Sequence, residues 1–459
     1  MSATQTTNLT RYPAGSIREL CTISWPIVLS SAAGYLMAVI DRLFLSHYSE
    51  AAFNACFAAT QWYWNFFCTT AEIVLIAEVF VGQLNGAKRF REIGSAVWQM
   101  IWFCLLLYAI FIPISIWGAP LLVADNVAEL GVPYLRILTL FIPIDCIGYC
   151  ALGAFFVGRG ETKIIPRVTI VSNLLNVVLD IPFIFGLKWG DTVLIPAGGV
   201  IGAAIATVVS QSLSALLLFG LFIRKSYRER YGTNRIALKP QFLGHCLKIG
   251  MPASLARFIN SLGWAILTQV IAANVSTDDF QAYGISHSIY ILFMFFNEGF
   301  SVGTRTICSN AMGAHQYHVV RRNCHAWVSL ILIVMGITAI GMIFFPEPLI
   351  RSFLTQGDTA LEITHTSAML RWAWIAFALE FTFMNMMSML IASGDTRFTM
   401  FVNTASFLCL SVVPTYIGVV YFGMTSILFW YSTLLDGSVR SLLFLKRYRS
   451  GRWMRHRII

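Results

Sequence analysis

Long apolar runs separated by short polar or charged segments dominate this chain of 459 residues. A helix needs about 20 mostly apolar residues to cross a bilayer. Division of the chain at glycine, proline and charge clusters predicts twelve such helices. Their predicted centres are Ala33, Phe67, Leu105, Ile142, Val177, Val208, Ile259, Phe295, Ile333, Phe377, Leu408 and Ser432. The pattern therefore predicts an all-α polytopic membrane protein.

The charges between the runs alternate along the chain. Basic residues gather around 88–91, 159–167, 224–239, 321–322 and 446–457, and the intervening loops are acidic or neutral. Because loops rich in Lys and Arg stay on the cytoplasmic side, we expect both termini to be cytoplasmic. The alternation also favours an even number of spans.

Composition agrees with a membrane protein. Hydrophobic residues make up 57% of the chain and charged residues 12%, whereas soluble domains carry about 25% charged residues. The net charge of +10 lies in loops and at the chain ends rather than on one face, so we expect no nucleic-acid partner. The ten cysteines are scattered and predict neither a disulfide framework nor a zinc site.

The beginning of the chain is polar and lacks an early apolar core. We therefore expect no cleaved signal peptide, and a multi-pass protein of a bacterial inner membrane. A monomer is the expected state, because the predicted cavity is built within one chain.

The two halves of the sequence repeat. Pro26 and Pro252 are separated by 226 positions, Gly86 and Gly313 by 227, and Glu161 and Asp395 by 234. A nearly constant offset at three places predicts an internal duplication. With six spans in each half, the repeats are parallel lobes around a central cavity, covering 1–240 and 241–459. The basic segment 224–240 is the expected cytoplasmic linker.

Two carboxylates fall inside predicted spans. Asp41 lies near the end of the first apolar run and Asp180 in the fifth, and Asn176 is four residues before Asp180, on the same helix face. A carboxylate at the centre of a span costs about 2.5–3.5 kcal/mol even on the lenient insertion scale. Such groups are kept where they face water, a partner or an ion, as in an ion-coupled carrier.

Several motifs together resemble the multidrug and toxic compound extrusion (MATE) family. They are the first-helix proline followed by an aspartate, NLLNVVLDIPFIFG, GGVIGAAIATVVSQ, and the paired GETK and GDTR turns. The resemblance covers nearly the whole chain and implies twelve helices in two lobes. It also implies export of drugs or metabolites in exchange for inward-moving protons or sodium. The family's cation-coupling positions match Asp41, Asn176, Asp180 and Thr207 here.

The coupling ion stays open at this stage. Hard cations prefer all-oxygen ligand sets, and two neighbouring carboxylates also suit proton capture. One branch of the family has a second site with an acid in the seventh helix, and Asn260 occupies that position here. Asp395 matches the tenth-helix acid and is the second-lobe candidate. The missing acid places the chain closer to the DNA-damage-inducible branch.

Other polar and aromatic residues in the spans are candidates for the substrate cavity. They are Glu72, Tyr63, Phe67, Arg257, Asn260 and Glu298. An acid in the cavity attracts organic cations, and aromatic rings stack on flat cationic substrates. The structural alternatives are a pair between Glu298 and Arg305 on one helix, and aromatic rings that face lipid.

Three function classes compete. The first is an antiporter that exports cationic or amphiphilic small molecules. The second, a flippase for lipid-linked precursors, needs a strongly cationic cavity, for which only Arg42, Arg257 and Arg305 are available. The third, a membrane-embedded enzyme, lacks any HExxH or GxSxG motif. We expect no cofactor, and no metal beyond sodium at the coupling positions.

Overall fold

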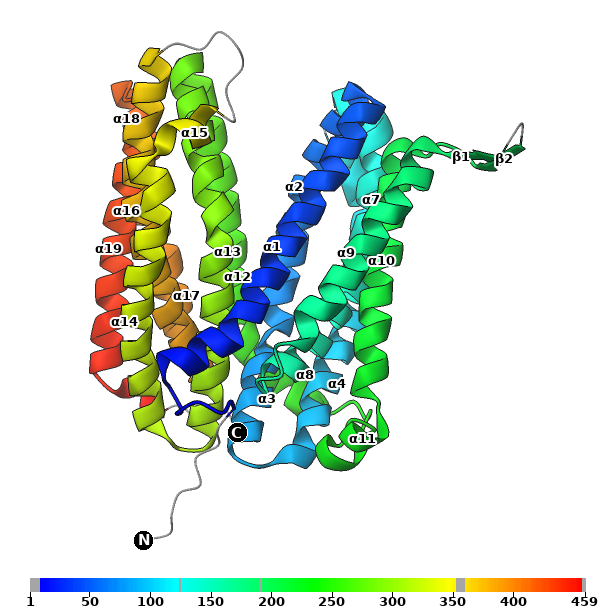
Figure 1. Ribbon diagram of the computed structural model, residues 1–459, viewed down its shortest axis with the longest axis vertical. Helices are drawn as coiled ribbons and strands as arrows, with labels where there is room; N and C mark the ends of the chain where they lie inside the picture. Colours follow the sequence, from blue (N-terminus) through cyan, green and yellow to red (C-terminus); the bar gives the residue numbers. More distant parts are fainter. Residues whose placement is uncertain (1–8, 124, 190–191, 352–359, 456–459) are drawn as a thin grey trace. The chain divides into compact units, whose positions relative to one another are not determined.

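The computed structural model describes residues 9–123, 125–189, 192–351 and 360–455. These residues are almost entirely helical (Figure 1). They form twelve long helical stretches, and each predicted centre lies inside one of them, which confirms the predicted spans.

Six stretches belong to the first repeat. They are α1 (Ile17–Tyr48); α2 (Glu50–Val74) with α3 (Ile76–Gly86); α4 (Phe90–Leu106) with α5 (Tyr108–Pro113), η1 (Ile114–Gly118) and α6 (Ala119–Leu122); α7 (Ala128–Asp145) with η3 (Cys146–Leu152) and α8 (Gly153–Val157); α9 (Ile164–Phe185); and α10 (Gly199–Phe222).

Six further stretches belong to the second repeat. They are α12 (Pro240–Asn274); α13 (Thr277–Gly313); α14 (Tyr317–Ala339) with η4 (Ile340–Phe344); α16 (Ala360–Ala392); α17 (Thr396–Phe407) with η5 (Leu408–Val412) and α18 (Val413–Phe422); and α19 (Ile427–Arg449). The short elements are η2 (Asp125–Val127), α11 (Lys225–Tyr231), α15 (Pro346–Arg351), η6 (Arg452–Arg455) and an antiparallel hairpin of β1 (Leu187–Trp189) and β2 (Thr192–Ile195).

Among the described residues, nine stretches are long and apolar enough to cross a membrane on length and composition alone. The other three are α1, α13 and α19. Each carries charge in its interior, including Asp41, Glu298 and Asp436 respectively. In α13 and α19 polar and charged residues lower the apolar content, whereas residues 23–40 of α1 form an uncharged, largely apolar run.

The chain divides into two compact units, as the two-lobe prediction requires. One contains Leu29–Ser254 and the other Met1–Val28 with Leu255–Ile458. In Figure 1 the helices of each unit run side by side, α2, α7, α9 and α10 in the first and α13, α14, α16 and α19 in the second. The predicted boundary at 240 marks the sequence repeat, whereas contacts move the ends of the two units to residues 28 and 254.

The first helix of each repeat contributes to both units. α1 changes unit after Val28 and α12 after Ser254, an offset of 254 − 28 = 226 positions. Pro26 and Pro252 lie two residues before these points and have the same offset, 252 − 26 = 226. A proline inside a helix removes one backbone hydrogen bond and favours a bend. The repeated proline therefore marks the place where each helix leaves one bundle for the other.

Two glycines one turn apart let α1 approach α13 closely within its unit. A Cβ on Gly303 would lie 1.9 Å from Oγ of Ser24, and one on Gly299 would lie 2.8 Å from the backbone N of Val28. Such a GxxxG spacing is the usual means of bringing membrane helices to close contact. The absent side chains thus fix the start of α1 against α13.

The residues before α1 also pack into this unit. The backbone N–H of Gly15 donates to Oε2 of Glu19 at 2.6 Å, and Gly15 has φ 72°, so another residue there would be strained. Glu19 is buried, and its 14-residue separation from the predicted span centre at Ala33 corresponds to about 21 Å of helix, beyond half the hydrocarbon thickness. Burial raises the pKa of Glu19 to about 7, although Gly15 and Arg322 oppose that change.

We expect Gly299→Ala to lower the free energy of unfolding by about 1–3 kcal/mol, because the new methyl group meets the backbone of α1. Gly284→Ala in the same helix is the matched control, since its Cβ would meet no atom within 4 Å. The measurement is thermal unfolding in detergent. Equal effects of the two substitutions would contradict the close contact.

Glu19 predicts a pH-dependent stability. Because burial raises its pKa from 4.5 to about 7 in the folded protein, the unfolded chain loses this proton first as the pH rises. The free energy of unfolding should therefore fall between about pH 4.5 and 7 and level off above that range. Glu19→Gln should flatten this part of the profile, measured as melting temperature against pH. A profile unchanged by the substitution would assign the dependence to other groups.

Candidate functional site

Close packing of α9 and α10 brings together two of the helices that carry the predicted coupling site. A Cβ on Gly202 would lie 1.9 Å from the carbonyl oxygen of Phe183, so α10 touches the backbone of α9 at this glycine. Gly202, in the GGVIGAAIAT segment, therefore serves helix packing. The carbonyl oxygen of Phe183 also accepts a hydrogen bond from N–H of Gly198 at 2.9 Å.

Polar side chains join α1 to α9 and α9 to α10. Oγ of Ser30 lies 2.8 Å from Oγ1 of Thr169, and Nδ2 of Asn173 donates to the carbonyl oxygen of Ala33 at 2.8 Å. On the other side of α9, Oγ of Ser172 donates to the carbonyl oxygen of Ser210 at 2.6 Å. These bonds set how α9 is rotated between its two neighbours.

The same three helices carry the four predicted coupling residues. Asp180 and Asn176 on α9 are 0% exposed and Asp41 on α1 is 8% exposed. Oγ1 of Thr207 on α10 lies 3.5 Å from Oδ2 of Asp41, a long and weak contact, and donates to the carbonyl oxygen of Ala203 at 3.0 Å. The carboxyl groups of Asp41 and Asp180 are close enough for each to feel the charge of the other. The fold therefore gathers these residues in one place within one unit.

Most polar atoms of this group lack a hydrogen-bond partner among the described residues. They are Oδ1 of Asp41, both carboxylate oxygens of Asp180, and both Oδ1 and Nδ2 of Asn176. Buried polar atoms in proteins are nearly always hydrogen-bonded, and leaving a buried one unsatisfied costs about 1–3 kcal/mol. An arrangement of two carboxylates and an amide in this condition is suited to hold a proton or a small cation.

Another carboxylate of the same unit, besides Asp41 and Asp180, has a partner that residue spacing alone did not reveal. OH of Tyr63 on α2 donates to Oδ2 of Asp145 on α7 at 2.8 Å. The ring of Tyr63 stacks on Phe67 with centroids 5.8 Å apart and planes at 21°. Glu72, farther along α2, is half-buried. Two of the predicted cavity residues, Tyr63 and Phe67, thus form one aromatic group against a buried acid.

A hydroxyl and thiol cluster on the same two elements was also missed. Sγ of Cys56 donates to OH of Tyr134 at 3.4 Å, and Oγ1 of Thr60 lies 3.5 Å from the same oxygen. All three residues are buried. A sequence signal existed only for Cys56 and Thr60, which are four residues apart on one helix face.

The remaining predicted residues belong to the other unit. Arg257 and Glu298 are exposed, and Asn260 is half-buried, with its Oδ1 lacking a hydrogen-bond partner among the described residues. The six predicted cavity residues are therefore divided between the units, with Glu72, Tyr63 and Phe67 in one and Arg257, Asn260 and Glu298 in the other.

Asp395 is held by an ion pair in the turn between α16 and α17. Nε of Arg447 donates to its Oδ2 at 2.6 Å and Nη2 of Arg447 to its Oδ1 at 3.1 Å. In the matching turn of the first repeat, Oε2 of Glu161 accepts from Arg159 at 3.0 Å and from OH of Tyr227 at 3.0 Å. Both repeats therefore use the acid of this turn to bind an arginine, and neither acid acts through a side-chain cap of the following helix.

The second unit contains a buried charged cluster that the sequence analysis did not assemble. Arg440 contacts Asp436 four residues earlier on α19 and donates from Nη1 to Oδ1 of Asn403 at 2.6 Å. OH of Tyr290 donates to Glu380. The i, i+4 spacing of Asp436 and Arg440 in an apolar run was the available signal.

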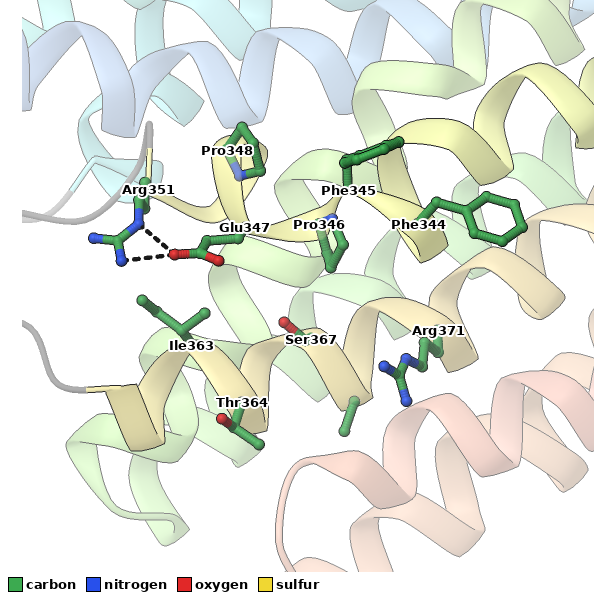
Figure 2. A pocket seen from close by; sticks show the side chains of 11 residues that line it. Phe344, Phe345, Pro346, Glu347, Pro348, Arg351, Ile363, Thr364, Ser367 and Arg371 are labelled. Atoms are coloured by element: carbon green, nitrogen blue, oxygen red, sulfur yellow. Dashed lines mark hydrogen bonds and ion pairs between the residues drawn. The ribbon is translucent and has the colours of Figure 1, made fainter.

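A cavity of about 660 Å³ lies elsewhere, among η4, α15 and α16. Figure 2 shows Glu347 and Arg351 paired at its edge, at 2.7 and 2.8 Å, with Arg371 projecting from α16. It contains none of the predicted site residues. Within the described residues, no cluster of three or more His, Cys, Asp or Glu side chains is arranged to hold a metal ion.

Substitution of the two kinds of buried aspartate should have opposite effects on stability. We expect Asp180→Asn to raise the melting temperature at alkaline pH. The substitution removes a buried charge that accepts no hydrogen bond among the described residues, and it also removes the repulsion between this charge and Asp41. Asp395→Asn should lower the free energy of unfolding by about 3–5 kcal/mol, because it breaks a buried ion pair and strands Arg447. Thermal unfolding measures both. A loss of stability in both variants would make Asp180 a structural residue.

Comparison with known proteins gives the family. The MatE family model matches residues 26–181 and 252–417. A probable multidrug resistance protein NorM from Thermotoga maritima is 24% identical over 458 residues, covering 96% of this chain and 94% of that protein.

Two solved structures share the fold. A MOP superfamily transporter from Pyrococcus furiosus, described as having reverse polarity of its binding pocket, superposes with a TM-score of 0.81 at 17% identity and covers 96% of this chain and 97% of its own. An outward-facing multidrug resistance MATE family transporter gives 0.81 at 18% identity, with the same coverage. With the family model matched in both halves, the chain belongs to the MatE family and is a multi-pass membrane transporter.

Proposed function

We propose that this protein is a secondary antiporter that exports cationic or amphiphilic small molecules in exchange for protons or sodium. The observation that supports it best is the group of buried carboxylate and amide atoms of Asp41, Asp180 and Asn176 without hydrogen-bond partners among the described residues. The Thermotoga maritima relative is a probable multidrug resistance protein, which is consistent with this substrate class.

The chemistry of the site accounts for exchange rather than simple binding. Asp41 and Asp180 together carry up to two negative charges in a buried place, which is stable only when a cation or proton is present. A coupling ion bound there satisfies the oxygens in one state of the cycle. An organic cation drawn to the same acids is favoured once that ion has left. When the binding of one ligand excludes the other, the two are linked by a coupling free energy. This linkage couples export of the substrate to the inward movement of the ion.

The ligand atoms of this site fit either coupling ion. Asp41, Asp180, Oδ1 of Asn176 and Oγ1 of Thr207 form an all-oxygen set, which fits a hard cation such as sodium. Proton coupling needs only the two carboxylates. Separate ion gradients in one assay therefore distinguish the two.

We place coupling in the unit that holds Asp41 and Asp180, as in the DNA-damage-inducible branch of the family. Asn260 replaces the acid of the alternative site. Asp395 has both oxygens engaged by Arg447, which leaves it poorly suited to take up an ion.

The proposed setting is an inner membrane, with both termini cytoplasmic and the protein acting as a monomer. The basic loops that support this orientation include the turn at Lys88–Arg91 and the segment 224–239, which belong to one unit.

The test is efflux of a fluorescent cationic dye from proteoliposomes under separate proton and sodium gradients. We expect the wild type to move dye with one of the two gradients, and Asp41→Asn to reduce gradient-driven efflux at least about tenfold, the effect of roughly 1.4 kcal/mol of lost coupling. Glu347→Gln is the control, an exposed carboxylate in the other unit that pairs with Arg351 in its own helix. Failure of both gradients to drive dye, or full activity of Asp41→Asn, would contradict the proposal.

A further inference from the structure

The segment that connects the two repeats is bound along α4. Nε1 of Trp98 donates to the carbonyl oxygen of Thr233 at 2.7 Å, and Nε1 of Trp102 donates to that of Ile236 at 2.7 Å. Nε2 of Gln99 donates to the carbonyl oxygen of Ala237 at 3.2 Å, and its Oε1 accepts from N–H of Lys239 at 2.7 Å. We call residues 232–239 the strap. Its backbone is non-helical, and side chains of one helix bind it along its length.

These hydrogen bonds give part of the strap's non-helical backbone partners within the protein. In lipid, a non-helical backbone is tolerated only where its polar groups find partners in the protein. From Gly94, which contacts Gly232, to Trp102, which binds Ile236, α4 rises by about 12 Å over eight residues. The two indole rings are typical of the membrane interface. The strap therefore follows α4 from its cytoplasmic end into the depth of the interface.

The start of the strap packs directly against α4. A Cβ on Gly94 would lie 2.5 Å from the carbonyl oxygen of Gly232, and Gly232 itself has φ 64°. Both positions require glycine, one for space and one for backbone conformation. The attachment is therefore a built contact.

Helix α11, immediately before the strap, packs against its unit through its aromatic side chains. The ring centroid of Tyr231 lies 5.6 Å from that of Phe155, and that of Tyr227 lies 5.4 Å from it. The guanidinium of Arg159 lies over the rings of Tyr231 and Tyr227 at 4.3 and 4.7 Å. In Figure 1, α11 lies beside the lower ends of α4 and α10 of its unit. The guanidinium of Arg230 lies over the rings of Tyr231 and Phe90 at 5.2 and 5.4 Å, and all charged residues of α11 are exposed.

The outward side of α11 and the strap is strongly basic. Residues 224–239 contain six cations and one acid, a net charge of 6 − 1 = +5. All six cations are exposed; they are Arg224, Lys225, Arg228, Arg230, Arg235 and Lys239. Lys88, in the turn before α4, and Arg91, in the first turn of α4, add exposed positive charge at the same end of that helix.

Two apolar side chains project from the strap between its cations. Ile236 is 52% exposed and Leu238 is 45% exposed, and they lie between Arg235 and Lys239. Side chains of this kind enter the acyl region of a membrane while neighbouring Lys and Arg side chains reach the phosphate level. Arg235 and Lys239 flank Ile236 and Leu238, and this arrangement fits the boundary between the phosphate level and the acyl region.

We propose that α11 and the strap form a binding surface for the headgroups of anionic phospholipids on the cytoplasmic side of this unit. The cations contact lipid phosphates, and Ile236 and Leu238 enter the acyl layer. The surface is made within one unit and is separate from Asp41 and Asp180, so it does not depend on the proposed transport function. The segment that connects the repeats thus binds two partners, helix α4 and the lipid of one leaflet.

The test counts lipids bound to the purified full-length protein by mass spectrometry, after equilibration in detergent with equal amounts of phosphatidylglycerol and phosphatidylcholine. The variant K225Q/R235Q/K239Q removes three exposed cations, of which Arg235 and Lys239 also attract Glu92 on α4. Each Lys or Arg near an anionic surface changes binding about fivefold. We therefore expect wild type to prefer phosphatidylglycerol, and the variant to lose at least about tenfold of that preference.

The matched control is K188Q/R351Q/R371Q, which removes three exposed cations outside α11 and the strap. It should bind lipid as the wild type does. Raising the ionic strength should release phosphatidylglycerol from the wild type, and this measurement does not depend on the folding of a variant. The proposal is wrong if the wild type binds both lipids equally, if K225Q/R235Q/K239Q keeps the preference, if the control loses it equally, or if salt has no effect.

Discussion

Two buried carboxylates, Asp41 and Asp180, are the constraint on which the rest of this structure depends. Among the described residues, both oxygens of Asp180 and Oδ1 of Asp41 accept no hydrogen bond, and Oδ2 of Asp41 has the long contact from Thr207. Apolar surroundings make each charge costly, and two like charges close together raise that cost. The packing around them is therefore specific. Gly202 lets α10 touch α9, and the bonds of Ser30 and Asn173 fix α1 against α9. The helices hold the acids together instead of letting them turn towards solvent.

The charged groups of the other unit contrast with this site. Asp395 accepts from Arg447 through both oxygens, Asp436 pairs with Arg440, and Glu380 accepts from Tyr290. Oδ1 of Asp436 has no hydrogen-bond partner among the described residues, but Arg440 balances the charge of this carboxylate. An acid paired with an arginine has little need of an external cation. The two repeats therefore hold their buried acids differently: Asp395 and Asp436 form ion pairs with arginines, whereas both oxygens of Asp180 and Oδ1 of Asp41 accept no hydrogen bond among the described residues.

Helix positions and the first-unit acids followed from the sequence because they depend on local composition. The twelve span centres needed only hydropathy, and Asp180 and Asn176 needed only the helical period. The partners of Asp145 and Asp395 did not follow, because Tyr63 and Arg447 lie on other helices whose rotation is set by packing. The unit boundary differed from 240 for the same reason: α1 and α12 change bundles after Pro26 and Pro252, which contacts reveal and repeat spacing does not.

The central claim is that Asp41 and Asp180 bind the ion that a cationic substrate displaces. The most direct measurement is the release of protons or sodium from purified protein when a cationic dye binds. The account predicts release of one of these ions from the wild type and from Glu347→Gln, and none from Asp180→Asn. Equal release from Asp180→Asn, or dye binding to the wild type without release of either ion, would contradict it.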